Sequence, residues 1–221
     1  MKNVVFLISL VHLLLAFSSS TSARTTPNPL LHVVYDTNGD ILRTDARYFV
    51  VVAPKFGAGG GVTRGPWLKA GYGAGDANFV CPSLVVQSPL DADKGVPVFF
   101  KPKAPKQVEI TESTPLNIRF YNPIGVCNNT LWEVEGYPGT SENPAFLSTN
   151  GKTGNPSTWF QIKKFNDELN AYRFVFCPIK ETCDEIVINH FKGQRLLTVR
   201  FGYRFPVVFV KDTHYGINSI I

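Results

Sequence analysis

The sequence predicts an all-β domain, and three observations support this fold class. Short runs rich in β-branched and aromatic residues recur along the chain, and apolar and polar residues alternate in several of them, as in residues 116–120 and 197–201. Turn residues separate these runs, and Asn38-Gly39 between two of them is a strong hairpin signal. No stretch has sustained helical periodicity. About twelve short strands at this spacing are typical of a β-sandwich, a barrel or a trefoil.

The expected strands are short and cover most of the chain. In residues 116–120, for example, leucine, isoleucine and phenylalanine alternate with asparagine and arginine, so that the apolar side chains share one face. The runs interpreted as strands are residues 31–35, 48–52, 83–87, 96–100, 107–111, 116–120, 131–134, 158–162, 172–176, 185–189, 196–201 and 207–210.

Two glycine-rich segments, residues 57–61 and 71–75, interrupt the expected strands. Neither has the strand before it and the helix after it that a dinucleotide-binding loop requires, and neither has the Gly-Lys-Ser/Thr of a phosphate-binding loop. Both are therefore interpreted as flexible surface loops.

The N-terminus has the features of a secretory signal peptide. A positive start at Lys2 is followed by an apolar run over residues 4–17 and by small residues that end at Ala23. The apolar run is shorter than the ~20 residues that a membrane-spanning helix needs, which disfavours the alternative of a signal anchor. We expect a signal peptide over residues 1–23 and a single secreted domain over residues 24–221.

The charge of the chain is mildly basic, with 22 lysines and arginines, 17 aspartates and glutamates, and a formal net charge of +5. The basic residues are scattered rather than gathered in a block, so nucleic acid is not an expected partner. No apolar run after residue 23 approaches membrane length, so no membrane partner is expected. We expect a soluble monomer. One small basic cluster, Lys101, Lys103 and Lys106, is spaced by prolines.

All four cysteines, Cys81, Cys127, Cys177 and Cys183, lie in the predicted mature domain. An even number of cysteines in a secreted chain favours two disulfides. Four cysteines allow three pairings, of which Cys81–Cys127 with Cys177–Cys183 is the natural first choice. Zinc is the alternative, but the chain has no Cys-x-x-Cys pair and His190 is the only nearby histidine, so no metal is expected.

Catalytic motifs are missing from the sequence. The chain has no Gly-x-Ser-x-Gly motif, and His32, His190 and His214 lie beside apolar residues without a local partner. The three tryptophans are expected to pack in a β-core rather than to stack on a ligand. We therefore expect neither an enzyme nor a bound cofactor.

A series of ordered motifs resembles the soybean-type Kunitz protease inhibitors of plants. Val-Tyr-Asp-Thr-Asn-Gly-Asp-Ile-Leu at residues 34–42, followed after five residues by Tyr-Phe-Val at residues 48–50, is similar to the N-terminal signature of that family. Leu-Arg-Thr at residues 42–44 is most similar to its miraculin-like branch. Further matches follow in order at residues 59–62, 81–82, 85–87, 131–134, 159–162 and 172–178.

This resemblance implies a β-trefoil of about twelve strands with the disulfides Cys81–Cys127 and Cys177–Cys183. It also implies an exposed, substrate-like loop between the first two half-cystines, in which a target protease engages one scissile peptide bond.

The expected reactive loop covers residues 103–108 and includes Ala104 and Pro105. Counting back from residues 116–120 places the scissile bond between Lys106 and Gln107, and Lys103 is the second choice because the alignment contains an insertion on that side. A lysine before the scissile bond suits a trypsin-like protease, whose specificity pocket has a carboxylate at its base.

Two details of the sequence bear on how firmly this loop is held. Pro102 and Pro105 restrict φ and are expected to keep the backbone extended, so that less entropy is lost on docking. Potent members of the family brace the loop with an asparagine at the position that is Thr44 here, and threonine is shorter and lacks the amide. We therefore expect a less firmly braced loop.

The resemblance thus predicts a secreted plant protease inhibitor directed at a trypsin-like serine endopeptidase. The alternatives are an inhibitor of papain-like cysteine proteases and a non-inhibitory miraculin-like defence or storage protein, because the fold alone does not separate them. The expected location is the extracellular apoplast, with the vacuole as the alternative. The triplet Asn128-Asn129-Thr130 predicts N-glycosylation at Asn128.

Overall fold

The structure is a computed structural model that describes residues 32–65, 81, 83–122, 128–179 and 182–214. The chain divides into two units, Met1–Leu30 and Leu31–Ile221. The first unit, with the predicted signal peptide, lies outside the described residues, as do Trp67, Cys127 and residues 71–75. All the elements named below lie in the second unit.

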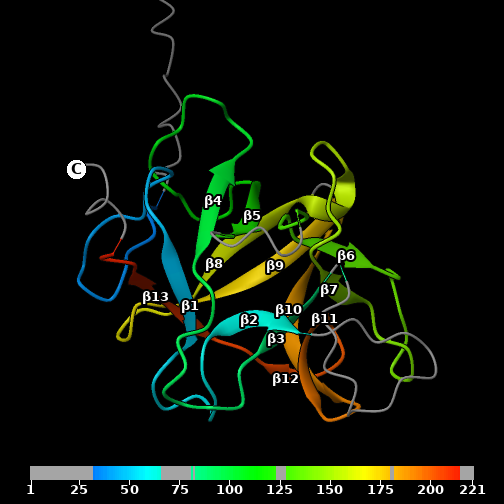
Figure 1. Ribbon diagram of the computed structural model, residues 1–221. Coiled ribbons are helices and arrows are strands. Elements are labelled where there is room, and N and C mark those ends of the chain that lie inside the picture. Colours follow the sequence, from blue (N-terminus) through cyan, green and yellow to red (C-terminus); the bar gives the residue numbers. More distant parts are fainter. Residues whose placement is uncertain (1–31, 66–80, 82, 123–127, 180–181, 215–221) are drawn as a thin grey trace, which may run out of the picture. The chain divides into compact units, whose positions relative to one another are not determined.

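The described residues form thirteen β-strands and one short 3-10 helix, which confirms the all-β prediction (Figure 1). No helix among them is long and apolar enough to cross a membrane. The elements are β1 (Tyr48–Val52), β2 (Val62–Gly65), β3 (Leu84–Gln87), β4 (Val98–Pro102), β5 (Leu116–Phe120), β6 (Glu133–Glu135), β7 (Phe146–Ser148), η1 (Pro156–Thr158), β8 (Phe160–Asn166), β9 (Ala171–Ile179), β10 (Thr182–Phe191), β11 (Gln194–Val199), β12 (Tyr203–Arg204) and β13 (Val207–Lys211).

Six of the strands close into a ring in the order β13, β1, β4, β5, β8 and β9. Three antiparallel ladders, β1–β13, β4–β5 and β8–β9, are paired over five or six residues each. Single residue pairs join each ladder to the next, and Val207 with Tyr172 closes the ring between β13 and β9. The other strands continue the sheet from β9 through β10.

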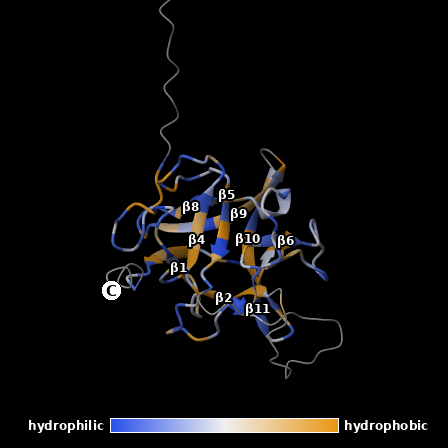
Figure 2. Ribbon diagram, turned by 45° about the horizontal axis from the view of Figure 1, so that its top comes forward, coloured by the Kyte–Doolittle hydropathy of each residue, from blue (hydrophilic) through white to orange (hydrophobic). Residues whose placement is uncertain are grey.

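The core accounts for the alternating sequence pattern. The three apolar side chains of β5 are buried. Of the two polar residues between them, Arg119 is exposed, whereas Asn117 is buried and its side-chain amide donates to the Thr158 carbonyl at 2.7 Å. Burial of each apolar side chain stabilises the fold by roughly 1.5–3 kcal/mol. Trp132 is fully buried and packs against the rings of Phe120, Phe160 and Phe174, which confirms its predicted role in the core. Figure 2 shows that apolar stretches follow many of the strands.

Some predicted strands differ from the structure. β5 occupies the predicted residues, but the runs at residues 31–35 and 107–111 form only isolated bridges, among them Val33 with Thr111. β2, β7 and β12 were not predicted, because runs of two to four residues are too short for alternation to appear.

The interpretation of residues 57–61 as a flexible surface loop is wrong for its second half. Gly59, Gly60 and Gly61 are buried, and their amides donate hydrogen bonds to the Asp91 side chain at 2.6 Å, the Ser88 carbonyl at 2.9 Å and the Asp93 carbonyl at 2.7 Å. A Cβ on Gly60 or Gly61 would collide with backbone carbonyl oxygens of residues 93 and 94. The glycines therefore allow two backbone segments to approach closely.

One of the two predicted disulfides is confirmed. Cys177 near the end of β9 is bonded to Cys183 near the start of β10, with an Sγ–Sγ distance of 2.06 Å. Cys81 is also disulfide-bonded. Because Cys127 lies outside the described residues, the pairing Cys81–Cys127 stays a prediction.

Candidate functional site: the loop between β4 and β5

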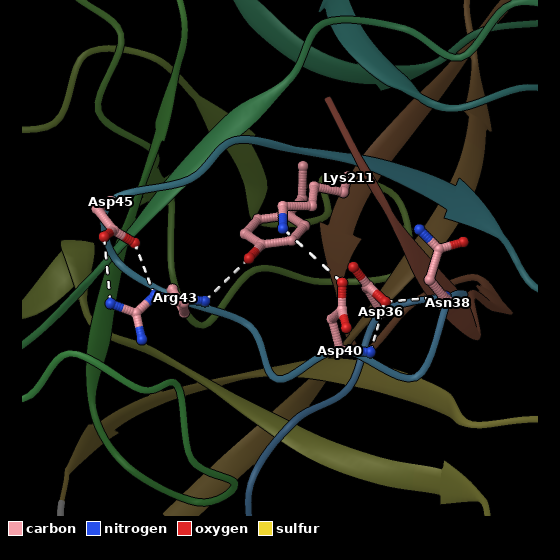
Figure 3. Close-up of polar contacts among 7 residues, drawn as sticks. Asp36, Asn38, Asp40, Arg43, Asp45 and Lys211 are labelled. Atoms are coloured by element: carbon pink, nitrogen blue, oxygen red, sulfur yellow. Dashed lines mark hydrogen bonds and ion pairs between the residues drawn. The ribbon is translucent and has the colours of Figure 1, made fainter. Parts of the chain in front are cut away.

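The N-terminal signature forms the predicted hairpin, and Figure 3 shows its polar contacts. The Asp36 amide bonds the Asp40 carbonyl at 2.9 Å, and Gly39 donates to the Asp36 carbonyl at 3.1 Å with a φ of +83°. The buried Asp36 carboxylate accepts hydrogen bonds from the amides of Asn38 at 2.8 Å and Asp40 at 3.0 Å. A left-handed glycine ending a three-residue hairpin is a common way to close such a turn.

The hairpin leads directly to Thr44, which lies beside the candidate loop. The Arg43 amide donates to the Tyr48 hydroxyl at 2.9 Å, and the next amide, that of Thr44, donates to the Val108 carbonyl at 2.9 Å. Burial raises the pKa of the Tyr48 phenol, so this hydroxyl stays neutral over the physiological range. Arg43 also pairs with Glu109 as an antiparallel bridge. The N-terminal segment therefore runs along the C-terminal half of the loop.

The loop connects β4 to β5 and projects beyond the strands in Figure 1. Its base is closed by the Lys103 amide, which donates to the Pro115 carbonyl at 2.8 Å. Ala104, Pro105, Lys106 and Lys103 are exposed, whereas Gln107 is half-buried. The loop thus has the accessible tip that recognition by a protease requires.

The prediction of an extended backbone is wrong for the centre of this loop. The Gln107 amide donates to the Ala104 carbonyl at 3.2 Å, which makes residues 104–107 a β-turn with Pro105 and Lys106 at its centre. Lys106 is not among the described residues with positive φ, so the turn is of type I rather than type II. Proline is favoured at the second position of type I turns, which is why Pro105 bends the chain here.

The two candidate lysines lie in different surroundings. The Lys103 ammonium lies 5.4 Å from the centroid of the Trp159 ring, at the base of the loop. Lys106 sits at the turn and makes no hydrogen bond or ion pair with any residue that the structure describes. A cation–π contact at an exposed site stabilises by about 0.5–1 kcal/mol, so Lys103 is the more restrained of the two.

A hydrogen-bond network of side chains on the C-terminal side of the turn was not predicted. The Gln107 carboxamide nitrogen donates to the Glu109 carbonyl at 2.8 Å and to the Thr111 hydroxyl at 2.9 Å. The Thr111 and Thr114 hydroxyls lie 2.9 Å apart, and Thr114 donates to the Thr111 carbonyl at 2.8 Å. No sequence motif marks this network, because the spacing of one glutamine and two threonines is common in loops.

A hollow of about 340 Å³ lies under the loop. Thr44 lines it together with Ala104, Pro105, Gln107 and Asn117. The Thr44 hydroxyl makes no hydrogen bond to any described residue, so only the backbone of Thr44 holds the loop. The structure thus brings Thr44 and the loop together, as the resemblance implies, with unfilled space between them.

The predicted glycosylation site lies in the segment that comes after β5. Asn128 is exposed, whereas Thr130 of the same triplet is buried and accepts a hydrogen bond from the Phe120 amide at its carbonyl. Modification of Asn128 stays a prediction.

Comparison with known proteins identifies the family. Residues 34–211 match the legume Kunitz family, described as trypsin and protease inhibitors. The chain is 32% identical over 201 residues to miraculin from Synsepalum dulcificum, covering 84% of this chain and 86% of miraculin. It is 31% identical over 197 residues to cysteine protease inhibitor 10 from Solanum tuberosum, covering 83% of this chain and 96% of that protein.

A solved complex of porcine pancreatic trypsin with soybean trypsin inhibitor contains a similar chain. Its TM-score is 0.62 at 27% identity, and the match covers 81% of this chain and 99% of that chain. The protein therefore belongs to the legume Kunitz family of trypsin and protease inhibitors and is not an enzyme.

Proposed function

We propose that this protein inhibits a trypsin-like serine endopeptidase by presenting Lys106 in the loop between β4 and β5. The observation that carries the proposal is the environment of Lys106, an exposed lysine in the middle of the turn with no partner among the described residues. Its ammonium is free to enter a specificity pocket that has a carboxylate at its base. Lys103, held over Trp159 at the base of the loop, is less available.

Docking in a protease cleft requires the turn to open, since a substrate binds there in an extended form. The hydrogen bond from the Gln107 amide to the Ala104 carbonyl is then lost, at a cost of about 0.5–1.5 kcal/mol. The hollow beside Thr44 leaves the opened loop with little support from below. Both features favour inhibition that is weaker than a rigid, extended loop would give.

A second candidate function is inhibition of a papain-like cysteine protease. The similarity to potato cysteine protease inhibitor 10 supports it, because that relative is matched over nearly its whole length. This activity would not depend on Lys106 entering a carboxylate-based pocket.

We further propose that the fold is a β-trefoil with both predicted disulfides. Three ladders joined in a ring by single residue pairs support a threefold arrangement. A bonded Cys81 and the confirmed Cys177–Cys183 bridge support the second disulfide.

Secretion through a signal peptide of residues 1–23, with a mature monomer glycosylated at Asn128, completes the proposal. Disulfides persist mainly in oxidising compartments, which supports an extracellular or vacuolar location. Exposure of Asn128 would let a glycan extend into solvent.

The test is a titration of trypsin, chymotrypsin and papain with the mature protein made in an oxidising compartment. We expect loss of trypsin activity in proportion to added protein, and a smaller effect on chymotrypsin. Papain inhibition without trypsin inhibition would overturn the serine-protease proposal in favour of the second candidate. No inhibition of any of the three proteases would leave the non-inhibitory alternative.

A further inference from the structure

We propose that Gln107 is a positioning residue, whose side chain holds the C-terminal half of the loop in place when the Lys106–Gln107 bond is cut. This inference rests on the proposed function and concerns how the same loop resists hydrolysis. The geometry points to Gln107 because its backbone carries the nitrogen of the scissile bond while its side chain is hydrogen-bonded to residues 109 and 111 further along the loop.

The carboxamide nitrogen of Gln107 has two hydrogen-bond acceptors. Both of its N–H groups are used, one on the Glu109 carbonyl at 2.8 Å and one on the Thr111 hydroxyl at 2.9 Å. The carboxamide cannot be reversed without loss, since the Glu109 carbonyl only accepts hydrogen bonds and would face an oxygen. The orientation of the side chain is therefore fixed by its partners.

The threonine hydroxyls complete the network in a consistent direction. Thr114 donates its hydroxyl proton to the Thr111 carbonyl at 2.8 Å, so the proton between the two hydroxyls comes from Thr111. Thr111 thereby accepts from Gln107 and donates to Thr114. Every hydroxyl proton in the network has one acceptor.

The network is attached to the rigid part of the molecule. Thr111 is only 6% exposed and pairs with Val33, and the preceding Ile110 is fully buried. The Ile110 amide donates to the Leu42 carbonyl at 2.8 Å, and Glu109 pairs with Arg43. The side chain of Gln107 thus links an exposed peptide bond to a segment anchored in the core.

The two hydrogen bonds of the Gln107 carboxamide, called the Gln107 anchor below, do not depend on the turn that docking opens. The hydrogen bond across the turn joins the Gln107 amide to Ala104, whereas the carboxamide contacts only residues 109 and 111. Rotation about the backbone of Pro105 and Lys106 can straighten the loop and leave the carboxamide bonded.

The chemical consequence concerns the acyl-enzyme. Attack of the protease serine oxygen on the Lys106 carbonyl forms an ester and breaks the bond to the Gln107 nitrogen, which takes up a proton and leaves as an amine. The reverse step is attack of that amine on the ester, which expels the serine oxygen and restores the peptide bond. Holding the amine close raises its effective concentration and favours this step over attack by water.

The N-terminal side of the bond is held independently. The Lys103 amide donates to the Pro115 carbonyl at 2.8 Å, close to the point where β5 begins. Both ends of a cleaved loop would therefore stay attached to the domain at separate points, and loss of the Gln107 hydrogen bonds would release only one of them.

The test uses Thr111→Val, which removes the acceptor of Gln107 with little change in volume and without altering a residue that faces the protease. We expect the rate of trypsin hydrolysis at Lys106–Gln107, followed by mass spectrometry, to rise about fivefold, the ratio for one hydrogen bond of about 1 kcal/mol at 1.4 kcal/mol per decade. The association rate with trypsin should not change. The matched control is Thr114→Val, which leaves both Gln107 bonds in place and should be hydrolysed at the parent rate.

A double-variant cycle separates the anchor from direct contacts of Gln107 with the protease. If Gln107 acts through Thr111, then Gln107→Leu combined with Thr111→Val should be hydrolysed no faster than Gln107→Leu alone. The inference would be overturned if the two substitutions raised the hydrolysis rate additively, or if Thr114→Val raised that rate as much as Thr111→Val. Thermal unfolding of each variant shows whether the domain has been loosened as a whole.

A second readout does not require a protease. Exchange of the Gln107 carboxamide protons with solvent, measured by NMR in the free protein, should be slow for both protons in the parent. In Thr111→Val the proton that bonded Thr111 should exchange fast, while the proton on the Glu109 carbonyl stays slow. Fast exchange in the parent would overturn the inference even if trypsin is inhibited. Slow exchange in a parent that trypsin neither binds nor cuts would instead overturn the proposed function and retain the anchor.

Discussion

Lys103 and Lys106 are three residues apart in sequence but differ in their surroundings. The sequence predicts that both lie in one loop, with Lys106 before the scissile bond. In the structure Lys103 faces Trp159, whereas Lys106 has no partner among the described residues. The bend at Pro105 was not foreseen, because proline suits a type I turn as well as an extended strand. The Gln107 network was not foreseen either, since it depends on side-chain directions that no pattern encodes.

Replacement of Lys106 tests its assignment as the primary specificity residue. Removing one member of a desolvated charge pair costs roughly 2–5 kcal/mol, so Lys106→Ala should weaken trypsin inhibition at least about thirtyfold, at 1.4 kcal/mol per decade. Lys103→Ala is the matched control and should change the inhibition constant little. Equal losses in the two variants would show that the scissile bond is misplaced, and a loss only in Lys103→Ala would move it to Lys103.

Thr44→Asn should strengthen inhibition. The Thr44 amide already bonds the Val108 carbonyl, so an asparagine would enter the hollow under the loop with its backbone in place. One new side-chain hydrogen bond to the loop would contribute about 0.5–1.5 kcal/mol, which lowers the inhibition constant for trypsin by about two- to tenfold. Thr44→Val, which keeps the shape and removes the hydroxyl, should behave like the parent. An unchanged or higher constant in Thr44→Asn would contradict the bracing argument.

At the scale of elements, a buried ion pair connects the start of β1 with the end of β13. Arg47 and Asp212 lie 2.8 Å apart with side chains only 5% and 6% exposed, and the Arg47 guanidinium lies 3.7 Å from the centroid of the Tyr121 ring. The Asp212 amide also donates to the Arg47 carbonyl at 2.9 Å. This contact fixes the junction from which the signature hairpin approaches the loop.

Breaking this pair from one side should strongly destabilise the fold. Asp212→Ala leaves Arg47 buried without its carboxylate and should lower the free energy of unfolding by about 3–5 kcal/mol. The measurement is chemical denaturation at pH 7. Replacing both partners, as Arg47→Met with Asp212→Leu, should recover much of the loss, because the uncompensated charge is then removed. A loss below about 1 kcal/mol in Asp212→Ala would mean that the pair is solvated.

Glu133 on β6 should make the fold more stable at low pH than at neutral pH, which is the opposite of the usual effect of a carboxylate. Burial, and next the neighbouring Glu135, raise the pKa of Glu133 above its ordinary value, against a hydrogen bond from Ser157. The folded state therefore holds the Glu133 proton more tightly than the unfolded state. Its contribution to stability is fully present below the unfolded pKa and is lost as the pH rises through the higher folded pKa.

Glu133→Gln removes this titration and tests it. At pH 7 the variant should melt at a higher temperature than the parent, because a neutral amide avoids the cost of burying a charge. At pH 4 the difference should be smaller, since Glu133 is then mostly protonated in the folded parent. An equal change in melting temperature at pH 4 and pH 7 would rule out ionisation of Glu133 as the cause.

How far strands could be predicted depended on their length and surroundings. β5 was located to the residue, because its apolar side chains face a core that gives a clear period of two. Residues 107–111 have similar composition but belong to the loop, where Glu109 and Thr111 pair with Arg43 and Val33 only as isolated bridges. The buried glycines at residues 59–61 show the same limit, since close backbone approach leaves no pattern in the sequence.

At the scale of the whole molecule, the all-β class, the family and the Cys177–Cys183 bridge could be predicted, because ordered motifs along the chain are specific to one fold. The closure of the ring could not, since it depends on the single pair of Val207 with Tyr172 between distant strands. Such long-range contacts follow from the packing of the core rather than from local preference.

The disulfide partner of Cys81 determines whether two chains are linked covalently. Cys81 is disulfide-bonded, and with Cys177 and Cys183 bonded to each other the one remaining cysteine of the chain is Cys127. An internal bridge of this span would stabilise the fold by roughly 4 kcal/mol in the chain-entropy model. Peptide mapping without reduction should find Cys81 linked to Cys127, and a non-reducing gel should show a single-chain band. A disulfide-linked dimer would contradict the monomer, and a link from Cys81 to Cys177 or Cys183 would contradict the fold as well.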